Sequence, residues 1–137
     1  MMETERQRAR DAAGAVIATL GDERSRSAIV GEPLLVQAPD GSPQSWFAPL
    51  VDGVELVGFV HLGLDLALRR VSSLRAPAAS WLDPAVVVDV ARRVARDDER
   101  LGQPVLSFDG SPDRLAWAVP VEGDGTLFVT GDYAWRG

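Results

Sequence analysis

One stretch of the chain predicts two β-strands and the turn between them: Trp46-Phe47-Ala48-Pro49-Leu50-Val51-Asp52-Gly53-Val54-Glu55-Leu56-Val57-Gly58-Phe59-Val60. Asp52 and Gly53 both tolerate the positive φ of a type I′ turn, and β-favouring residues stand on either side. Pro49 has no N–H to donate, so the first strand should lie at a sheet edge or carry a bulge there. We therefore expect an antiparallel hairpin.

A second copy of this pattern follows later in the chain: Trp117-Ala118-Val119-Pro120-Val121-Glu122-Gly123-Asp124-Gly125-Thr126-Leu127-Phe128-Val129. In both copies a Trp stands three residues before a Pro, and an acidic-Gly turn comes next. The turn at 40–43 recurs unchanged at 109–112, and the residues at 31–35 resemble those at 102–106. Three matches in the same order indicate an internal duplication, with repeats over about 3–75 and 81–137.

The second strand of the hairpin has the clearest alternation in the chain. We expect one face to be core, formed by Val54, Leu56, Gly58, Val60 and Leu62. The other face is mixed and is open to solvent, a covering helix or a partner; it carries Glu55, Val57, Phe59 and His61. Residues 64–75 fit a strand or a short helix, and we favour a strand over about 67–73. Residues 75–80 read as a connector.

Apolar periodicity predicts two main helices. The first runs from about Glu5 to Leu20 and ends at Gly21, and a further helical turn is open for residues 22–30. The second begins at Pro84 behind an Asp83 N-cap and runs to about residue 101. Its inward positions should be Val87, Val90, Ala91 and Val94.

These elements predict an α+β fold with one antiparallel sheet of about six to seven strands and two main helices. Each repeat would supply a helix followed by three strands. Such a small unit has difficulty burying both faces of its own sheet, so we expect the two repeats to share one core within a single domain over 1–137.

Composition narrows the classes of partner. The chain has 137 residues, a net charge of −6 and no Cys. An acidic chain lacks the positive field that nucleic acid requires, and the missing Cys excludes disulfides and zinc–thiolate sites. We expect no nucleic-acid partner, no membrane span and no cofactor. The charged amino-terminal residues lack a signal-peptide pattern, so we expect a cytoplasmic location.

Few residues suggest chemistry. His61 is the only histidine and the only side chain with an ordinary pKa near neutrality, but no nucleophile or metal-ligand pattern accompanies it. The acidic run 97–99 sits at an expected helix end, where consecutive side chains diverge, so we predict no metal site. Arg69, with Arg70 and Arg75, offers a place for an anionic group or an acidic partner, although solubilising surface arginines are the simpler interpretation.

The chain has four tryptophans. Trp46 and Trp117 occupy matching positions in the two repeats, and we interpret them as core residues. Trp81 in the expected connector and Trp135 in the expected terminal tail have the character of contact anchors, because large aromatic rings often anchor interfaces.

The predicted order of elements consists of a helix and then a three-stranded antiparallel meander, with the segment Val57-Gly58-Phe59-Val60 after a hairpin. This order resembles PepSY-like and cystatin-like modules. These are small non-catalytic α+β units that often occur in pairs. The resemblance lies in the order of the elements, covers each half of the chain, and assigns neither a function nor a functional residue. PepSY proteins are typically exported, which differs from the location expected for this chain.

Two functions follow as hypotheses. The first is a non-enzymatic module that binds a protein partner, or a second copy of itself, through a sheet edge or face, with Trp81 and Trp135 as anchors. The second is a small-molecule binder or enzyme with a pocket between sheet and helices, lined by Phe59, His61 and Arg69.

Overall fold

The computed structural model describes residues 2–112, 114–123 and 125–137, and it has an α+β fold with two antiparallel sheets of five and four strands. The chain forms two compact units, one made of residues 1–36 and 43–77 and the other of 37–42 and 78–137. The α+β class with antiparallel strands is confirmed. The single sheet of six to seven strands is wrong, and one shared core stays a prediction.

The first unit contains two helices and the five-stranded sheet. Its elements are α1 (Met2–Leu20), α2 (Glu23–Ser27), β1 (Ile29–Val30), β2 (Leu34–Gln37), β3 (Pro43–Asp52), β4 (Glu55–Gly63) and β5 (Leu68–Pro77). Strands β3, β4 and β5 form an antiparallel meander, and both β1 and β2 pair with β3. The strand interpretation of residues 67–73 is confirmed, whereas 75–80 is no connector because β5 extends to Pro77.

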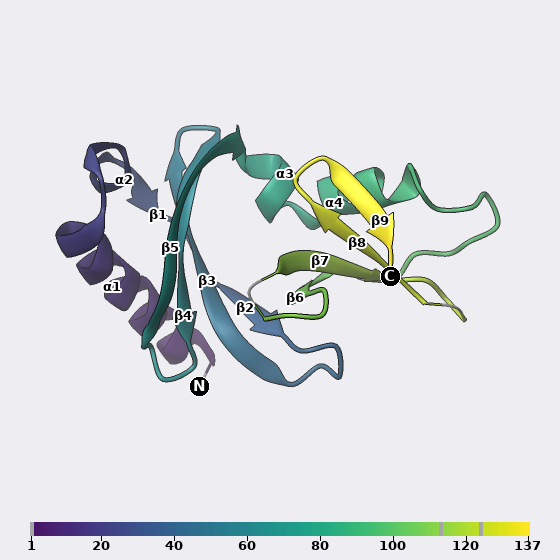
Figure 1. Cartoon of the computed structure of the whole chain (residues 1–137), viewed down its shortest axis with the longest axis horizontal. Coiled ribbons are helices and arrows are strands. Elements are labelled where there is room, and N and C mark those ends of the chain that lie inside the picture. Colours follow the sequence, from purple (N-terminus) through teal and green to yellow (C-terminus); the bar gives the residue numbers. More distant parts are fainter. Residues whose placement is uncertain (1, 113, 124) are drawn as a thin grey trace. The chain divides into compact units, whose positions relative to one another are not determined.

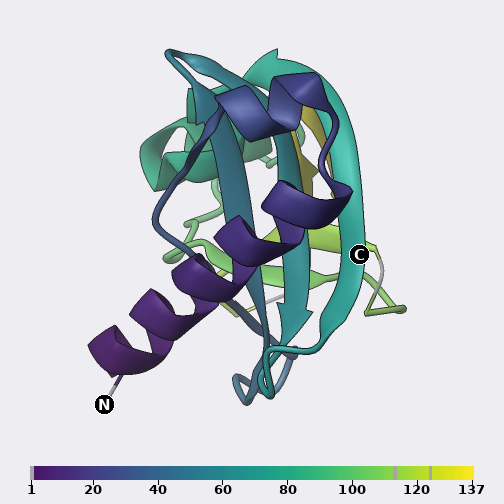
Figure 2. The same cartoon turned by 90° about the vertical axis from the view of Figure 1, so that its left-hand side faces the viewer.

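Helix α1 covers one face of this sheet (Figures 1 and 2). Its small residues Ala9 and Ala13, with Ile17, are buried, so the helix approaches the strands closely. They pack with Trp46, Ala48, Leu50, Val57, Val60 and Leu62 from β3 and β4. The helix ends where predicted. Gly21 donates its N–H to the Ile17 carbonyl at 2.9 Å, and a Cβ at Gly21 would clash with that oxygen, so glycine suits the position where the chain leaves the helix.

The β3–β4 hairpin forms where expected but turns one residue later. Asp52 pairs with Glu55, so Gly53 and Val54 are the turn residues. Gly53 has a φ of 62° and Val54 does not have a positive φ, as in a type II′ turn. Val54 is therefore 88% exposed, and its expected place in the core is wrong.

A bulge beyond the turn changes which side chains of β4 face α1. Against β3, Leu56 pairs with Val51 and Gly58 with Leu50, so Val57 is the extra residue. Val57 then joins the α1 core instead of the mixed face. The mixed face is itself buried, since Phe59 is 4% exposed and His61 is 1% exposed.

The second unit contains two shorter helices and the four-stranded sheet. Its elements are α3 (Ala78–Leu82), α4 (Pro84–Arg92), β6 (Val105–Phe108), β7 (Leu115–Pro120), β8 (Thr126–Thr130) and β9 (Tyr133–Arg136). The sheet is a meander in the order β6-β7-β8-β9, and α4 lies alongside β8 and β9 (Figure 1). Its buried residues include Val87, Val90, Ala91, Leu106, Trp117, Val119, Leu127 and Val129.

Helix α4 begins as predicted and ends about nine residues early. The Asp83 side chain accepts the N–H of Ala85, and Pro84 follows it. At the other end, Arg93 and Val94 bond back only three residues, and the chain leaves the helix. Val94 is 40% exposed, so its predicted inward position is wrong. Tertiary contacts of Glu99, described below, take the place of further helical turns.

The two units contain matching contacts around their strand prolines. Gly31 donates its N–H to the Pro49 carbonyl at 2.8 Å, and Gly102 donates to the Pro120 carbonyl at 2.8 Å. Val30 pairs with Leu50 in the first unit. Leu101 forms the corresponding bridge with Val121 in the second. The first sheet has five strands and the second has four, whereas the sequence predicted three strands from each repeat.

Candidate functional site

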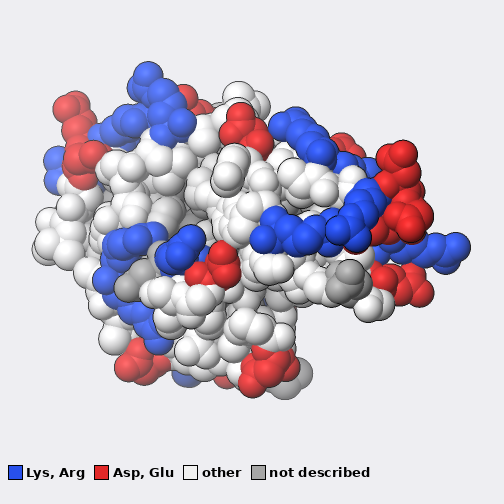
Figure 3. Space-filling view, turned by 45° about the vertical axis from the view of Figure 1, so that its right-hand side comes forward, with Lys and Arg blue, Asp and Glu red and all other residues white. Residues whose placement is uncertain are grey.

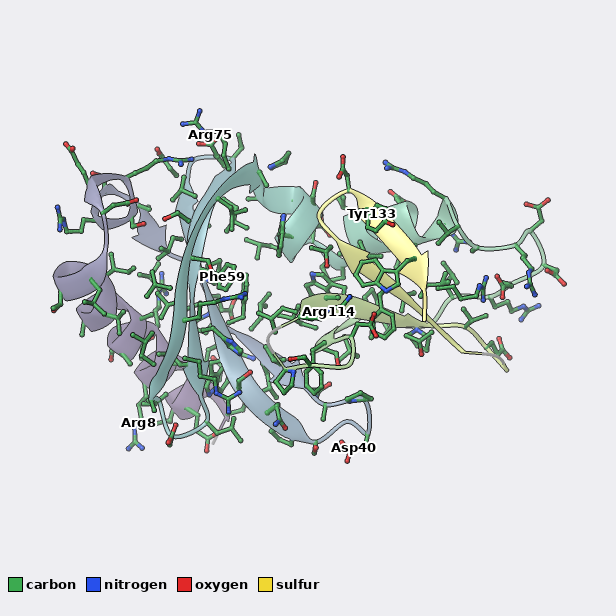
Figure 4. The ribbon with its side chains drawn as sticks, viewed as in Figure 1. Arg8, Asp40, Phe59, Arg75, Arg114 and Tyr133 are labelled. Atoms are coloured by element: carbon green, nitrogen blue, oxygen red, sulfur yellow. The ribbon has the colours of Figure 1, made fainter. Side chains whose placement is uncertain are left out.

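Phe59 and His61 lie on β4, on the sheet face opposite α1, as the labelled Phe59 shows in Figure 4. The Phe59 ring stacks on Phe47 with centroids 4.7 Å apart. His61 Nε2 lies 2.7 Å from the Ser45 hydroxyl oxygen. Both side chains are nearly inaccessible, so a ligand could reach the imidazole only after neighbouring side chains had moved.

The three arginines near residue 70 lie on β5, the outer strand of the first sheet. Arg70, and not Arg69, contacts the predicted site, because its guanidinium carbon lies 5.3 Å from the centre of the Phe59 ring. Arg69 is exposed, and Arg75 forms an ion pair with Glu55 at 3.4 Å. Arg75 projects away from the end of the sheet in Figure 4. The structure thus groups these cations along a strand edge.

Trp81 and Trp135 belong to regular elements and not to a connector or tail. Trp81 lies in α3, where its carbonyl accepts the indole N–H of Trp117 at 2.8 Å. Trp135 lies in β9 between Phe128 and Tyr133, with ring centres 5.8 and 5.6 Å away. Its indole N–H bonds to Asp109 at 2.9 Å. Both rings are half-buried and contribute to the second unit's own packing.

Trp46 and Trp117 are core residues, as predicted, with exposures of 2% and 5%. The guanidinium of Arg6 lies 5.9 Å from the Trp46 ring, a cation–π distance. These two tryptophans therefore support the fold and are not available to a partner.

A groove of about 520 Å³ lies in the first unit, between the start of α1 and the end of the β4–β5 hairpin. Glu5, Arg8 and Asp65 give it charges of both signs, and Leu66 contributes from a turn in which its φ is 68°. A leucine rarely adopts this conformation. Hydrogen bonds from the Leu66 N–H to Gly63 and from the Ala67 N–H to Asp65 hold the turn.

A smaller cavity of about 200 Å³ lies in the second unit, on the sheet face that carries Val105, Ser107, Ala118, Thr126 and Phe128. Sequence reasoning missed it, because these residues are common in strands and share no motif. A polar Ser107 inside the apolar run 105–108 was the available signal. The lining is completed by five further residues of the same unit, which are Gln37, Ala38, Pro39, Gly41 and Pro120.

Among the carboxylates that the structure describes, Glu99 in the second unit has the most strongly shifted pKa. Arg136 donates two hydrogen bonds to it, at 2.6 and 3.1 Å, and the N–H of Arg96 donates a third at 2.7 Å. These bonds, that of Arg136 first, lower the pKa of Glu99 from 4.5 to about 2. Hydrogen bonds from Ser25 and Ser42 likewise lower the pKa values of Asp22 and Asp40. These are structural contacts of loops and caps.

Glu99 should make the second unit sensitive to acid. A carboxylate with a lowered pKa stabilises the fold above its ordinary pKa of 4.5, and this stabilisation disappears as the pH falls toward about 2. We expect the melting temperature of the native chain to fall over this range more steeply than that of Glu99→Gln. Circular dichroism melts at several pH values measure the difference. Parallel curves for the two proteins would contradict the role of the Arg136 pair.

Within the described residues, no group of three or more His, Cys, Asp or Glu side chains is suited to hold a metal ion. None of the described helices is long and apolar enough to span a membrane. Figure 3 shows basic and acidic side chains interspersed on the face that it draws. The cytoplasmic location stays a prediction.

Comparison of the chain with protein-family models, with curated proteins and with solved structures gives no match. The resemblance to PepSY-like and cystatin-like modules is limited to the order of the elements. The function is therefore inferred from the residues of this chain.

Proposed function

We propose that the protein is a non-enzymatic interaction module that binds an extended, acidic segment of a partner protein along strand β5. The observation that carries the proposal is an open strand edge that bears three arginines and no acidic residue. Addition of a strand to an exposed sheet edge is a common mode of peptide recognition, in which backbone hydrogen bonds supply the affinity.

The geometry of β5 supports this mode. The strand spans ten residues, and in the described part of the chain only β4 pairs with it. All ten of its residues are exposed or half-buried, whereas most residues of β3 and β4 are buried. A long strand with one free side presents unpaired N–H and C=O groups along its length. It can therefore accept a partner strand without disturbing the core.

Charge favours an acidic occupant over a second copy. Arg69 and Arg70 repel a cation and attract carboxylates, and Arg75 adds a third positive charge that Glu55 partly offsets. In a symmetric antiparallel pair of β5 strands centred between Ser72 and Ser73, Arg70 of one copy would face Arg75 of the other. Like charges directly opposite each other destabilise a strand pair. Self-association through this edge is thus the weaker form of the hypothesis.

A binding role, as opposed to catalysis, is supported by the state of His61. The ring is 1% exposed and bonded to Ser45, which suits a structural histidine. The alternative of a small-molecule pocket around Phe59 and His61 stays a prediction, and no contact described above favours it.

A labelled ten-residue peptide of alternating Val and Glu tests the proposal. We expect it to bind the native chain in fluorescence anisotropy, and to bind the double variant Arg69→Glu/Arg70→Glu about tenfold more weakly. A Val–Lys peptide and the variant Arg92→Glu, which changes an exposed arginine on α4, are the matched controls. Equal affinity in the double variant, or hydrogen-exchange protection outside β5, would overturn the proposal.

We also infer that the two units arose by duplication of one helix-and-meander unit. The repeated turn at 40–43 and 109–112, the matching Trp–Pro pairs and the equivalent bonds to the Pro49 and Pro120 carbonyls support this inference. The order β2-β3-β4-β5 also corresponds to β6-β7-β8-β9. Under this inference, each repeat supplies one of the two sheets.

A further inference from the structure

We propose that the second unit binds a small, neutral, mainly apolar molecule with one hydrogen-bonding group in the cavity beside Ser107. This site is separate from the β5 edge, and none of the residues that line it belongs to β5. Three independent features lead to it: the volume of the cavity, the apolar sheet face beneath it, and a buried hydroxyl.

The floor of the cavity is one face of the second sheet. Ala118 pairs with Val105 on one side and with Phe128 on the other, so these three side chains lie next to each other. The buried residues Trp117, Val119, Leu127 and Val129 occupy the opposite face. The cavity floor is therefore apolar, with an aromatic ring at one side.

The small side chain of Ala118 accounts for the empty volume of the cavity. In the first unit, the residue after the matching tryptophan is Phe47, whose ring is buried and stacked on Phe59. In the second unit, the residue after Trp117 is only an alanine. The missing ring corresponds to a cavity of about 200 Å³. An apolar cavity of about 150 Å³ is large enough to hold benzene.

Ser107 supplies the polar feature. The residue is 2% exposed, and its hydroxyl has no hydrogen-bond partner among the described residues. A buried hydroxyl without a partner is unfavourable, and a ligand that bonds to it recovers that free energy. Ser107 lies on the same sheet face as Val105 and lines the cavity. Its hydroxyl oxygen is itself buried, so we expect rotation about χ1 to turn it toward a bound group.

The lining residues indicate a neutral ligand. None of the ten residues around the cavity is charged, and those with polar side chains are Ser107, Thr126 and Gln37. A charged ligand would lose its hydration without gaining an ion pair. A single aromatic ring with one hydroxyl or amide group matches both the volume and the chemistry.

Benzyl alcohol and toluene are suitable probes, because they differ by the hydroxyl group. The test is to titrate each probe into the full chain and to follow the amide chemical shifts by NMR. Both probes should shift the amide signals of residues 105–107, 118 and 126–128. Benzyl alcohol should bind about 3- to 10-fold more tightly than toluene, as one hydrogen bond predicts. Ser107→Ala should remove this preference and leave toluene binding unchanged.

Ala118→Phe fills the cavity with the side chain found after Trp46 and should abolish binding of both probes. If Ala118→Phe does not fold, the smaller change Ala118→Val takes its place and should weaken the binding of both probes. Thr19→Ala, on the exposed side of α1, is the control and should bind like the native chain. The proposal is overturned if neither probe saturates, if the shifts map elsewhere, or if Ala118→Val and Ser107→Ala both bind as the native chain does.

Discussion

Replacing Trp46 with alanine is expected to cost about 3 to 5 kcal/mol of unfolding free energy. The ring is 2% exposed and packs among Ala9, Ala13 and the apolar face of β3 and β4, so its removal opens a cavity that small helix residues cannot fill. Urea unfolding followed by far-ultraviolet circular dichroism measures the loss.

Trp135→Ala is the matched control for this measurement. Trp135 is only half-buried and contacts Phe128 and Tyr133 on one side of β9. We expect it to cost about 1 to 2 kcal/mol, because two ring contacts are lost and no enclosed cavity forms. Equal costs for the two variants would contradict the assignment of Trp46 to the core.

Gly58→Ala is expected to destabilise the first unit by at least about 2 kcal/mol. A Cβ at this position would meet the carbonyl oxygen of Ser72 well inside van der Waals contact, and the Leu50 side chain would lie 3.4 Å away. Ser72 belongs to the backbone of β5, so relief requires β4 and β5 to separate. The variant should therefore also increase hydrogen exchange in β5.

Gly14→Ala provides the opposite result from the same chemical change. Gly14 lies within α1, and a Cβ there would meet nothing within 4 Å. Alanine favours the helix, so we expect a gain of about 0.5 to 1 kcal/mol. Thermal melts of both variants give the comparison. A neutral Gly58→Ala would show that β4 and β5 are not in close contact at Ser72.

Much of the local structure could be predicted from the sequence, because it depends on local signals. Gly21 ends α1 and Asp83 begins α4 through contacts within a few residues. The β3–β4 hairpin likewise follows from its own residues, although the turn centre shifted to Gly53 and Val54. The short α4 could not be predicted, since Glu99 bonds to Arg136, which is 37 residues away.

The arrangement of strands depends on long-range pairing that alternation does not specify. Periodicity identified strands but not which of them share a sheet, so we expected one sheet where two form. Strand β9 was missed as a terminal tail, although Gly131 and Asp132 resemble the turn residues at 52–53 that signalled the first hairpin.

The candidate sites show the same division. The alternation along β4 placed Phe59 and His61 on one strand face. The same pattern cannot show whether that face is covered, and both side chains are buried. Arg69 was predicted for a pocket, whereas Arg70 contacts Phe59 and all three arginines lie along an edge. The cavity beside Ser107 depends on the small side chain of Ala118. An alanine in a strand is common, so the sequence alone did not indicate a cavity.

The distribution of tryptophans gives the protein a built-in spectroscopic label. Trp46 is the single tryptophan of the first unit, and the other three belong to the second. Emission from a Trp46→Phe chain would therefore come from the second unit alone, and the difference from the native spectrum would isolate one buried indole with Arg6 beside its ring. Tryptophan fluorescence can thus report separately on peptide binding at β5, in the first unit, and on ligand binding at Ser107, in the second unit.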